Sequence, residues 1–150
     1  MNFNSVQEII DFAIAREKEA VSFYMTCGEK AERQEMKAAF QEMAEEEARH
    51  VTFLENVAVS ALTEDALHTV NDPKMESYIV EKPFHPNMSY QELLQLAIHR
   101  EAASYQLYNT ILENTPDAAA RKILQRLADE ELKHKERLEE EYNTQVLREN

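Results

Sequence analysis

The sequence carries the same pattern twice. Residues 5–55 align on residues 89–139 at a constant offset of 84, without a gap, and 17 of the 51 aligned pairs are identical. Two copies are too few for a solenoid, in which stacked repeats complete each other's core. The repeat therefore predicts two similar helical hairpins that pack on each other as one two-fold bundle.

Each copy has the pattern of two helices joined by a turn. Both copies open with a capping box, Ser5 with Glu8 and Ser89 with Glu92, followed by apolar residues spaced three and four apart. No alternating run of β-branched residues indicates a strand. We therefore expect an all-α chain with helices over residues 5–28, 32–58, 89–114 and 116–144.

The turns and the join between the copies predict the connectivity. Gly28 is expected to end the first helix, and Thr115 and Pro116 suit the start of the last one. The join is about 30 residues long, whereas adjacent antiparallel helices are linked by about 2–8 residues. This length favours a crossover along the bundle. The expected organisation is one ferritin-like four-helix domain over residues 1–150, with a hairpin at 5–58, the crossover at 59–88 and a hairpin at 89–144.

Composition excludes several classes of site and partner. Gly28 is the only glycine, so the chain has neither a phosphate-binding loop nor a dinucleotide turn. Cys27 is the only cysteine, which excludes a disulfide or a thiolate metal site within the chain. The net charge of −13 would repel a nucleic-acid backbone. With no signal-peptide pattern and no apolar run of about 18 residues, we expect a cytoplasmic protein without a membrane partner.

Two Glu-x-x-His motifs lie at equivalent positions of the two copies, and residues three apart share one face of a helix. In each copy, a further glutamate lies 30 residues before the glutamate of the motif (47 − 17 and 131 − 101). The midpoint of each pair falls at a predicted turn, and residues equally distant from the turn of an antiparallel hairpin lie at one level. The residues predicted to bind metal are Glu17, Glu47, His50, Glu101, Glu131 and His134.

Charge balance supports a metal site at this level. Four carboxylates buried together are very costly without counter-charge, and two divalent cations would balance them. One glutamate from each of two helices and Glu-x-x-His from each of the other two is the ligand pattern of di-iron and di-manganese bundles. Ligation by oxygen and imidazole without thiolate favours iron or manganese over structural zinc. The expected cofactor is two iron ions, with manganese or zinc as possible substitutes. The alternative is a bundle in which the acids extend to solvent and bind no metal.

A tyrosine follows each of the single glutamates by seven residues, which is two helical turns along the same face. These residues are Tyr24 and Tyr108. Their hydroxyls are expected to reach the ligands and to orient a carboxylate or pass a proton or an electron. The alternative is a pair of ordinary core tyrosines.

Residues next to the predicted ligands are expected to leave room beside the metals and to lie at the solvent-exposed surface. The small side chains of Ala20 and Ser104 leave room beside the metals for a diatomic ligand. Arg16 and Arg100, each directly before a ligand glutamate, are expected to form surface ion pairs. The residues expected on the solvated face are Glu45, Glu46, Asp129 and Glu130.

These motifs resemble the di-iron domain of the rubrerythrins, within the ferritin-like superfamily, over residues 5–142. Paired Glu-x-x-His motifs are specific for the superfamily, although bacterioferritins use a similar ligand set. The resemblance implies two irons that are bridged by two glutamates, each iron also bound by one further glutamate and one histidine. The resemblance makes Glu47 and Glu131 the bridging glutamates. Glu17 and Glu101 would be the further glutamates, one on each iron, and His50 and His134 the histidines.

The resemblance also implies an activity and a partner. Rubrerythrins reduce hydrogen peroxide with electrons from a C-terminal rubredoxin domain, whose site needs more than the one cysteine present here. The implied donor is therefore a separate protein such as a rubredoxin. The family carries an extra glutamate three residues after the ligand in its third helix, and this residue is Ser104 here.

The expected function is a di-iron oxidoreductase that reduces hydrogen peroxide or dioxygen, acting as a homodimer. One alternative is an iron-binding or ferroxidase protein without peroxidase turnover. A second alternative is a structural bundle that holds little metal. The iron content of the protein separates the last possibility from the first two.

Overall fold

The computed structural model describes residues 6–56, 85, 87–116 and 118–149 of the 150-residue chain. These residues contain four helices and no strand, which confirms the all-α prediction. The predicted crossover at 59–88 lies outside the described residues except for positions 85, 87 and 88. The helices are α1 (Val6–Lys30), α2 (Gln34–Asn56), α4 (Tyr90–Glu113) and α5 (Ala118–Glu149).

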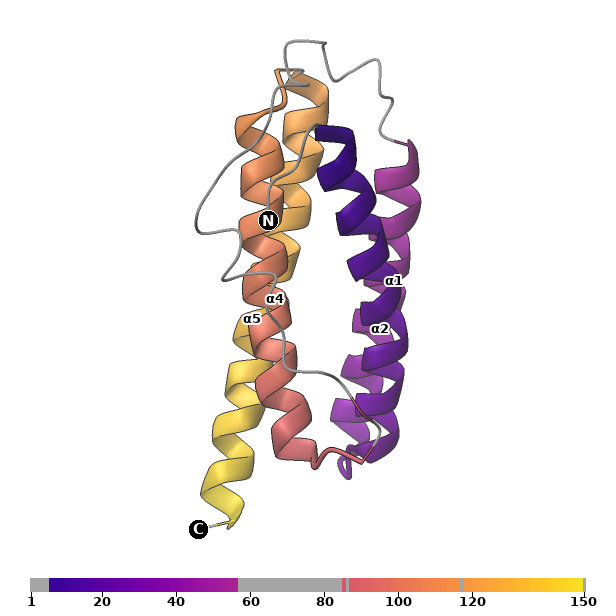
Figure 1. Cartoon of the computed structure of the whole chain (residues 1–150). Coiled ribbons are helices and arrows are strands. Elements are labelled where there is room, and N and C mark those ends of the chain that lie inside the picture. Colours follow the sequence, from indigo (N-terminus) through magenta and orange to yellow (C-terminus); the bar gives the residue numbers. More distant parts are fainter. Residues whose placement is uncertain (1–5, 57–84, 86, 117, 150) are drawn as a thin grey trace.

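The helices pair as two antiparallel hairpins. α1 packs along α2, α4 packs along α5, and α1 also contacts α4 (Figure 1). In Figure 1, α2 ends at the top of the bundle and α4 begins at the bottom, so the two helices run in the same direction. This is the one-crossover connectivity that the length of the join predicted. None of the described helices has the length and apolar character needed to cross a bilayer.

The core consists of two apolar clusters separated by a polar level. One cluster holds Ile9, Leu54, Ile111 and Leu124, and the other holds residues such as Phe23, Phe40, Leu93 and Leu138. Each of the four helices contributes to both clusters, and in each helix the predicted metal ligands fall between the two contributions. Burial of a large apolar side chain stabilises a fold by about 1.5–3 kcal/mol. The two clusters therefore stabilise the bundle on both sides of the polar level.

The helix ends confirm some expectations and correct others. Ser89 forms the expected capping box: its Oγ accepts from the Glu92 backbone N–H at 3.1 Å, and the Glu92 carboxylate accepts from the Ser89 N–H at 3.2 Å. Ser5 lies outside the described residues. Thr115 does not begin the last helix; its hydroxyl donates to the Ile111 carbonyl at 2.6 Å and closes the end of α4. α5 also continues to Glu149, five residues beyond the predicted end.

The prediction that Gly28 ends the first helix is wrong. α1 continues to Lys30, and Gly28 has no positive φ. Gly28 instead lies where α1 and α2 approach closely, because a Cβ atom on it would be 3.5 Å from the Cβ of Phe40. Lys37 of α2 donates to the Gly28 carbonyl at 3.1 Å, which satisfies an acceptor near the end of α1.

Replacing Gly28 with alanine should stabilise the protein. The new methyl group would meet Phe40 at an ordinary van der Waals distance of 3.5 Å, and alanine in a helix is favoured over glycine by about 0.5–1 kcal/mol. Urea unfolding should show a higher midpoint with an unchanged slope. Ala38→Gly, on the exposed side of α2, is the matched control and should lower the midpoint. A lower midpoint for Gly28→Ala would contradict the helical conformation described here.

Candidate metal centre

The structure brings all six predicted ligands together at the polar level of the bundle. They form two groups whose ligand atoms lie within 4.8 Å of one another, and all six side chains are buried. Glu47 and Glu131 belong to both groups. Glu17 and His50 complete the first group, and Glu101 and His134 complete the second.

Each of the six residues presents one buried polar atom without a hydrogen-bond partner among the described residues. Such atoms are costly to bury unless another partner satisfies them. Carboxylate oxygens and imidazole nitrogens are the donors that iron and manganese accept. The donor set therefore fits a pair of such metals. The six atoms are Glu17 Oε2, Glu47 Oε1, His50 Nδ1, Glu101 Oε2, Glu131 Oε1 and His134 Nδ1.

The two histidines turn the same nitrogen toward the carboxylates. His50 Nδ1 lies 2.8 Å from Glu131 Oε1 and 3.4 Å from Glu17 Oε2. His134 Nδ1 lies 2.9 Å from Glu47 Oε1. The Nε2 atoms point outward, so Nδ1 of each ring is the atom available to a metal.

Glu46 and Glu130 hold the outer nitrogens of these rings. His50 Nε2 is 2.6 Å from Glu130 Oε2, and His134 Nε2 pairs with Glu46. A carboxylate that accepts from Nε2–H fixes the tautomer in which Nδ1 can bind metal. The prediction that these two glutamates are simply solvated is therefore wrong. The repeat held the signal, because both are identical in the two copies and directly precede a motif glutamate.

The tyrosines contact the terminal glutamates across the bundle. Tyr108 Oη donates to Glu17 Oε1 at 2.8 Å, and Tyr24 donates to Glu101 Oε1. Each tyrosine therefore serves the glutamate of the other hairpin and not the one on its own helix. Burial, followed by the charges of nearby glutamates, raises the pKa of both phenols well above the ordinary value. Both hydroxyls therefore keep their protons and act as donors.

Electrostatics in the cluster favour protonation when no metal is bound. Burial, with Glu101 and Glu47 nearby, raises the pKa of Glu131 well above its ordinary value. Burial opposes a charge on His134, but the carboxylates of Glu101 and Glu47 outweigh it and raise the pKa of the imidazole to about 11. The pKa of His50 is raised in the same way. Protons then supply the counter-charge that the buried carboxylates require.

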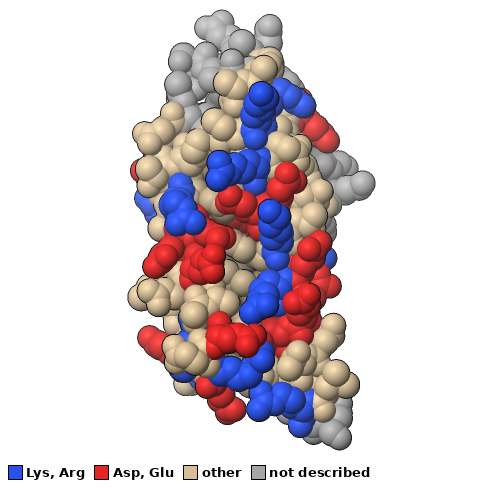
Figure 2. All heavy atoms as spheres, turned by 180° about the vertical axis from the view of Figure 1, so that it is seen from behind, with Lys and Arg blue, Asp and Glu red and all other residues tan. Residues whose placement is uncertain are grey.

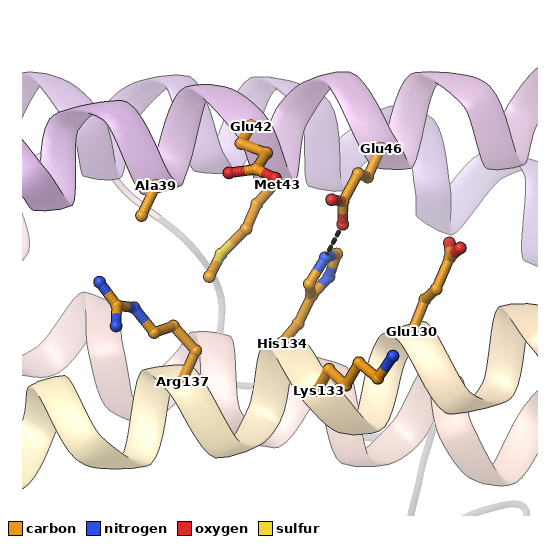
Figure 3. A pocket seen from close by; sticks show the side chains of 8 residues that line it. All are labelled: Ala39, Glu42, Met43, Glu46, Glu130, Lys133, His134 and Arg137. Carbon is orange, nitrogen blue, oxygen red and sulfur yellow. Dashed lines mark hydrogen bonds and ion pairs between the residues drawn. The ribbon is translucent and has the colours of Figure 1, made fainter.

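Two cavities approach the cluster from different sides. A small one of about 10 Å³ is lined by Ala20 and Ser104, together with Tyr24, Glu47 and Glu101, where the sequence predicted a gap. A volume of this size holds about one water molecule. A larger hollow of about 360 Å³ lies between α2 and α5. Figure 3 shows its lining residues, with His134 facing Glu46 of the opposite helix.

The surface over the larger hollow is mixed in sign. Lys133 and Arg137 line the hollow together with three glutamates (Figure 3). On the face opposite to the view of Figure 1, Lys and Arg side chains form a column flanked by Asp and Glu (Figure 2). The net charge of −13 is therefore not spread as a uniform negative surface on this face.

The side chains of Arg16, Arg100 and Cys27 are largely buried. Arg16 and Arg100 are only 17% and 13% exposed, so the prediction of surface ion pairs is wrong for the arginine side of each pair. Both line the small cavity. Cys27 is buried, and burial raises the pKa of its thiol to about 12, as expected for an inert core residue.

Without metal, the free energy of unfolding should decrease as the pH rises from 6.5 toward 11. The pKa of His134 is about 11 in the folded chain against an ordinary 6.5. Its proton therefore stabilises the fold fully below pH 6.5, and this contribution is lost toward pH 11. The raised pKa of Glu131 acts in the same direction. Urea unfolding of metal-free protein over this pH range measures the effect.

The matched sample is the protein loaded with Zn²⁺, which is redox-inactive. Bound metal ions displace these protons from the cluster. The free energy of unfolding of the loaded protein should therefore depend much less on pH. An equally steep dependence in loaded and metal-free protein would contradict the assignment of these protons to the cluster.

Removing the carboxylate behind a histidine should weaken metal binding without removing a ligand. Glu46→Ala and Glu130→Ala should each lower the affinity for Zn²⁺ or Fe²⁺ by about 10–100-fold. Chelator competition measures this affinity. The controls are Glu45→Ala and Asp129→Ala, exposed residues one position earlier. Equal metal affinities in a variant and its control would contradict the role of that glutamate in positioning a histidine.

Comparisons with known proteins identify the fold and the family of the chain. A crystal structure from Thermotoga maritima, described as a ferritin-like diiron-carboxylate protein, matches with a TM-score of 0.78 at 22% identity. The match covers 93% of this chain and 95% of that one, and it confirms the ferritin-like fold. No curated protein matches the sequence. The sequence profile of the rubrerythrin family matches residues 8–142, and the chain therefore belongs to the rubrerythrin family.

Proposed function

We propose that this chain binds two iron ions and reduces hydrogen peroxide or dioxygen with electrons from a separate donor protein such as a rubredoxin. The observation that carries this proposal is the set of six buried ligand atoms, one from each predicted residue, without hydrogen-bond partners. Membership of the rubrerythrin family supports the class of chemistry. Bound iron would supply the two electrons that the oxidant takes up.

The ligand groups suggest how the residues divide the work. Glu47 and Glu131 are common to both groups and would bridge the two ions. Glu17 with His50, and Glu101 with His134, would each complete one ion. Tyr108 and Tyr24 hold the two terminal glutamates from the opposite hairpin. One oxygen of each of these two carboxylates is thus held by a tyrosine before a metal arrives, and the other oxygen is left for the metal.

The small cavity limits the oxidant and places a proton near it. Its volume of about 10 Å³ holds about one water molecule, so only a very small oxidant could enter beside the ligands. Reduction of peroxide to two water molecules consumes two electrons and two protons. Tyr24 lines the cavity and keeps its proton, and Ser104 is a second hydroxyl on the cavity wall. The chain therefore places two hydroxyl groups that can donate hydrogen bonds beside the space where the oxidant would be reduced.

Ser104 also supports the second candidate, an iron-binding or ferroxidase protein without peroxidase turnover. This residue lines the cavity next to Glu101, at the position where the resemblance places an extra carboxylate. A serine hydroxyl is a poor metal ligand compared with a carboxylate. Without that carboxylate, oxidation of the metal pair could proceed once without efficient turnover.

Iron loading tests the proposal. Anaerobic addition of Fe²⁺ followed by desalting should leave two irons per chain, one for each ligand group. Glu47→Ala, which removes a residue of both groups, should retain fewer. Glu45→Ala, an exposed neighbour, is the control and should retain two. Near-zero iron in the wild-type protein would refute the metal assignment.

The loaded protein then separates the two candidate functions. Stopped-flow mixing with peroxide or with dioxygen ranks the oxidants by rate. Repeated oxidation with a reduced rubredoxin present would support the oxidoreductase. A single oxidation without turnover would favour the ferroxidase, and a sizing column would distinguish a homodimer from a storage cage.

A further inference from the structure

The hollow between α2 and α5 is large enough to admit a hydrated cation. Its volume is about 360 Å³, whereas a divalent ion with its shell of water molecules occupies roughly 180 Å³, since each water takes about 30 Å³. The small cavity beside Glu47 and Glu101, of about 10 Å³, does not admit such an ion. A metal that arrives with its water shell therefore fits the hollow and not the small cavity.

His134 lies between this hollow and the ligand cluster. The residue lines the hollow (Figure 3), and at 6% it is the most exposed of the six predicted ligands, the others being 1–2% exposed. Its Nε2 atom pairs with Glu46, another lining residue, while Nδ1 lies 2.9 Å from Glu47 Oε1 inside the cluster. Nδ1 has no hydrogen-bond partner among the described residues. One side of this imidazole therefore faces the hollow, and the other faces the proposed metal position.

The two outer glutamates have different neighbours one helical turn earlier. Arg126 precedes Glu130, and its Nε donates to Glu130 Oε1 at 3.3 Å. The equivalent residue before Glu46 is Glu42, which lines the hollow and forms no hydrogen bond or ion pair within the described part of the chain. Two carboxylates one turn apart attract a cation, whereas the arginine offsets the charge of the outer glutamate in the other half. The side of His134 is therefore the more favourable one for a cation.

Two basic side chains also line the hollow, and neither closes it to a cation. Arg137 donates to Glu35 Oε1 at 3.4 Å and to Met36 Sδ at 3.8 Å, so part of its charge is already matched. Lys133 is exposed, and a long lysine side chain can turn to solvent. Three carboxylates face these two bases, and the net charge of −13 raises the concentration of cations around the chain. The hollow as a whole therefore favours a cation over an anion.

We propose that metal ions reach the ligand cluster through this hollow, and that Glu42 and Glu46 capture them on the way. A cation bound at Glu46 replaces the Nε2–H of His134 as the partner of that carboxylate. The imidazole is then released and can turn aside while the ion passes. The inference rests on the metal binding of the proposed function and adds the route of uptake. Glu42 acts in uptake alone, because it forms no bond to any of the six ligands.

Stopped-flow uptake of Co²⁺ by metal-free protein tests the route, because Co²⁺ accepts oxygen and nitrogen ligands and changes its absorption on binding. In about 0.15 M salt, charges act over about 8 Å, so distant substitutions have little effect. Glu42→Gln should slow uptake by about threefold, and Glu42→Arg, which copies the second repeat, by about tenfold. The matched control is Glu45→Gln, which should take up Co²⁺ at the wild-type rate. Glu45 is also exposed on α2, but it lines the groove between α1 and α2.

The equilibrium affinity separates a residue on the route from a residue that supports the bound metal. A residue that the ion meets only during passage changes the association and dissociation rates by the same factor. Glu42→Gln should therefore leave the Kd for Co²⁺, measured by chelator competition, unchanged. A Kd that weakens in proportion to the slower uptake would mean that Glu42 acts on the bound metal, and this would overturn its role in the route.

Lys133→Gln provides a test of the opposite sign. Lys133 is exposed, so its substitution should leave the fold intact. Removal of its positive charge from the wall of the hollow should speed the uptake of Co²⁺ by about twofold without a change in Kd. Equal uptake rates in wild type, Glu42→Gln and Lys133→Gln would refute this route.

The same samples keep the route apart from the proposed function. The expected changes in Co²⁺ uptake, together with no reaction of the iron-loaded protein with peroxide or dioxygen, would end the oxidoreductase proposal and support the route. Turnover by the iron-loaded protein, together with wild-type uptake in Glu42→Arg, would support the function and overturn the route. A chain that takes up no Co²⁺ would overturn the route and the metal assignment together.

Discussion

Four carboxylates and two imidazoles are buried at one level of the bundle, and this concentration of charge governs the rest of the structure. Burying such groups without counter-charge is strongly unfavourable. Apolar clusters above and below the level supply the stability that holds the groups in place. Protons on the imidazoles and on Glu131 can neutralise the cluster, and divalent cations can do so in their place. The fold is therefore built around a centre whose charge has to be balanced, by protons or by divalent cations.

The two hairpins complete each other's chemistry. No predicted ligand is positioned only by its own hairpin, because the residues that orient terminal glutamates and histidines come from the opposite one. Either hairpin alone would leave its ligands without these partners. The polar level thereby specifies how the hairpins pair. The pairs that cross between the hairpins are Tyr24–Glu101, Tyr108–Glu17, His50–Glu130 and His134–Glu46.

The convergence of the six predicted ligands could be anticipated from the sequence, because helix periodicity and distance from a turn determine the level and the face of a residue. The error at Gly28 left this result unchanged, because the observed turn between Lys30 and Gln34 is centred on residue 32, the midpoint of Glu17 and Glu47. The contacts of Glu46 and Arg100 depend on a residue of another helix that lies opposite. Such contacts depend on how the helices cross, and the residue pattern along a single helix does not show how they cross.

The departures from two-fold symmetry lie outside the ligand cluster. The repeat preserves every ligand, both tyrosines and both outer glutamates, but pairs Glu19 with Ala103 and Ala20 with Ser104. A groove of about 600 Å³ between α1 and α2 is lined by Gly28 and Ala48, where the second hairpin has leucines. A symmetric metal pair needs equivalent ligands in both halves, whereas a single small molecule approaches from one side. Under the proposed function, selectivity for the oxidant would therefore reside in the positions where the halves differ.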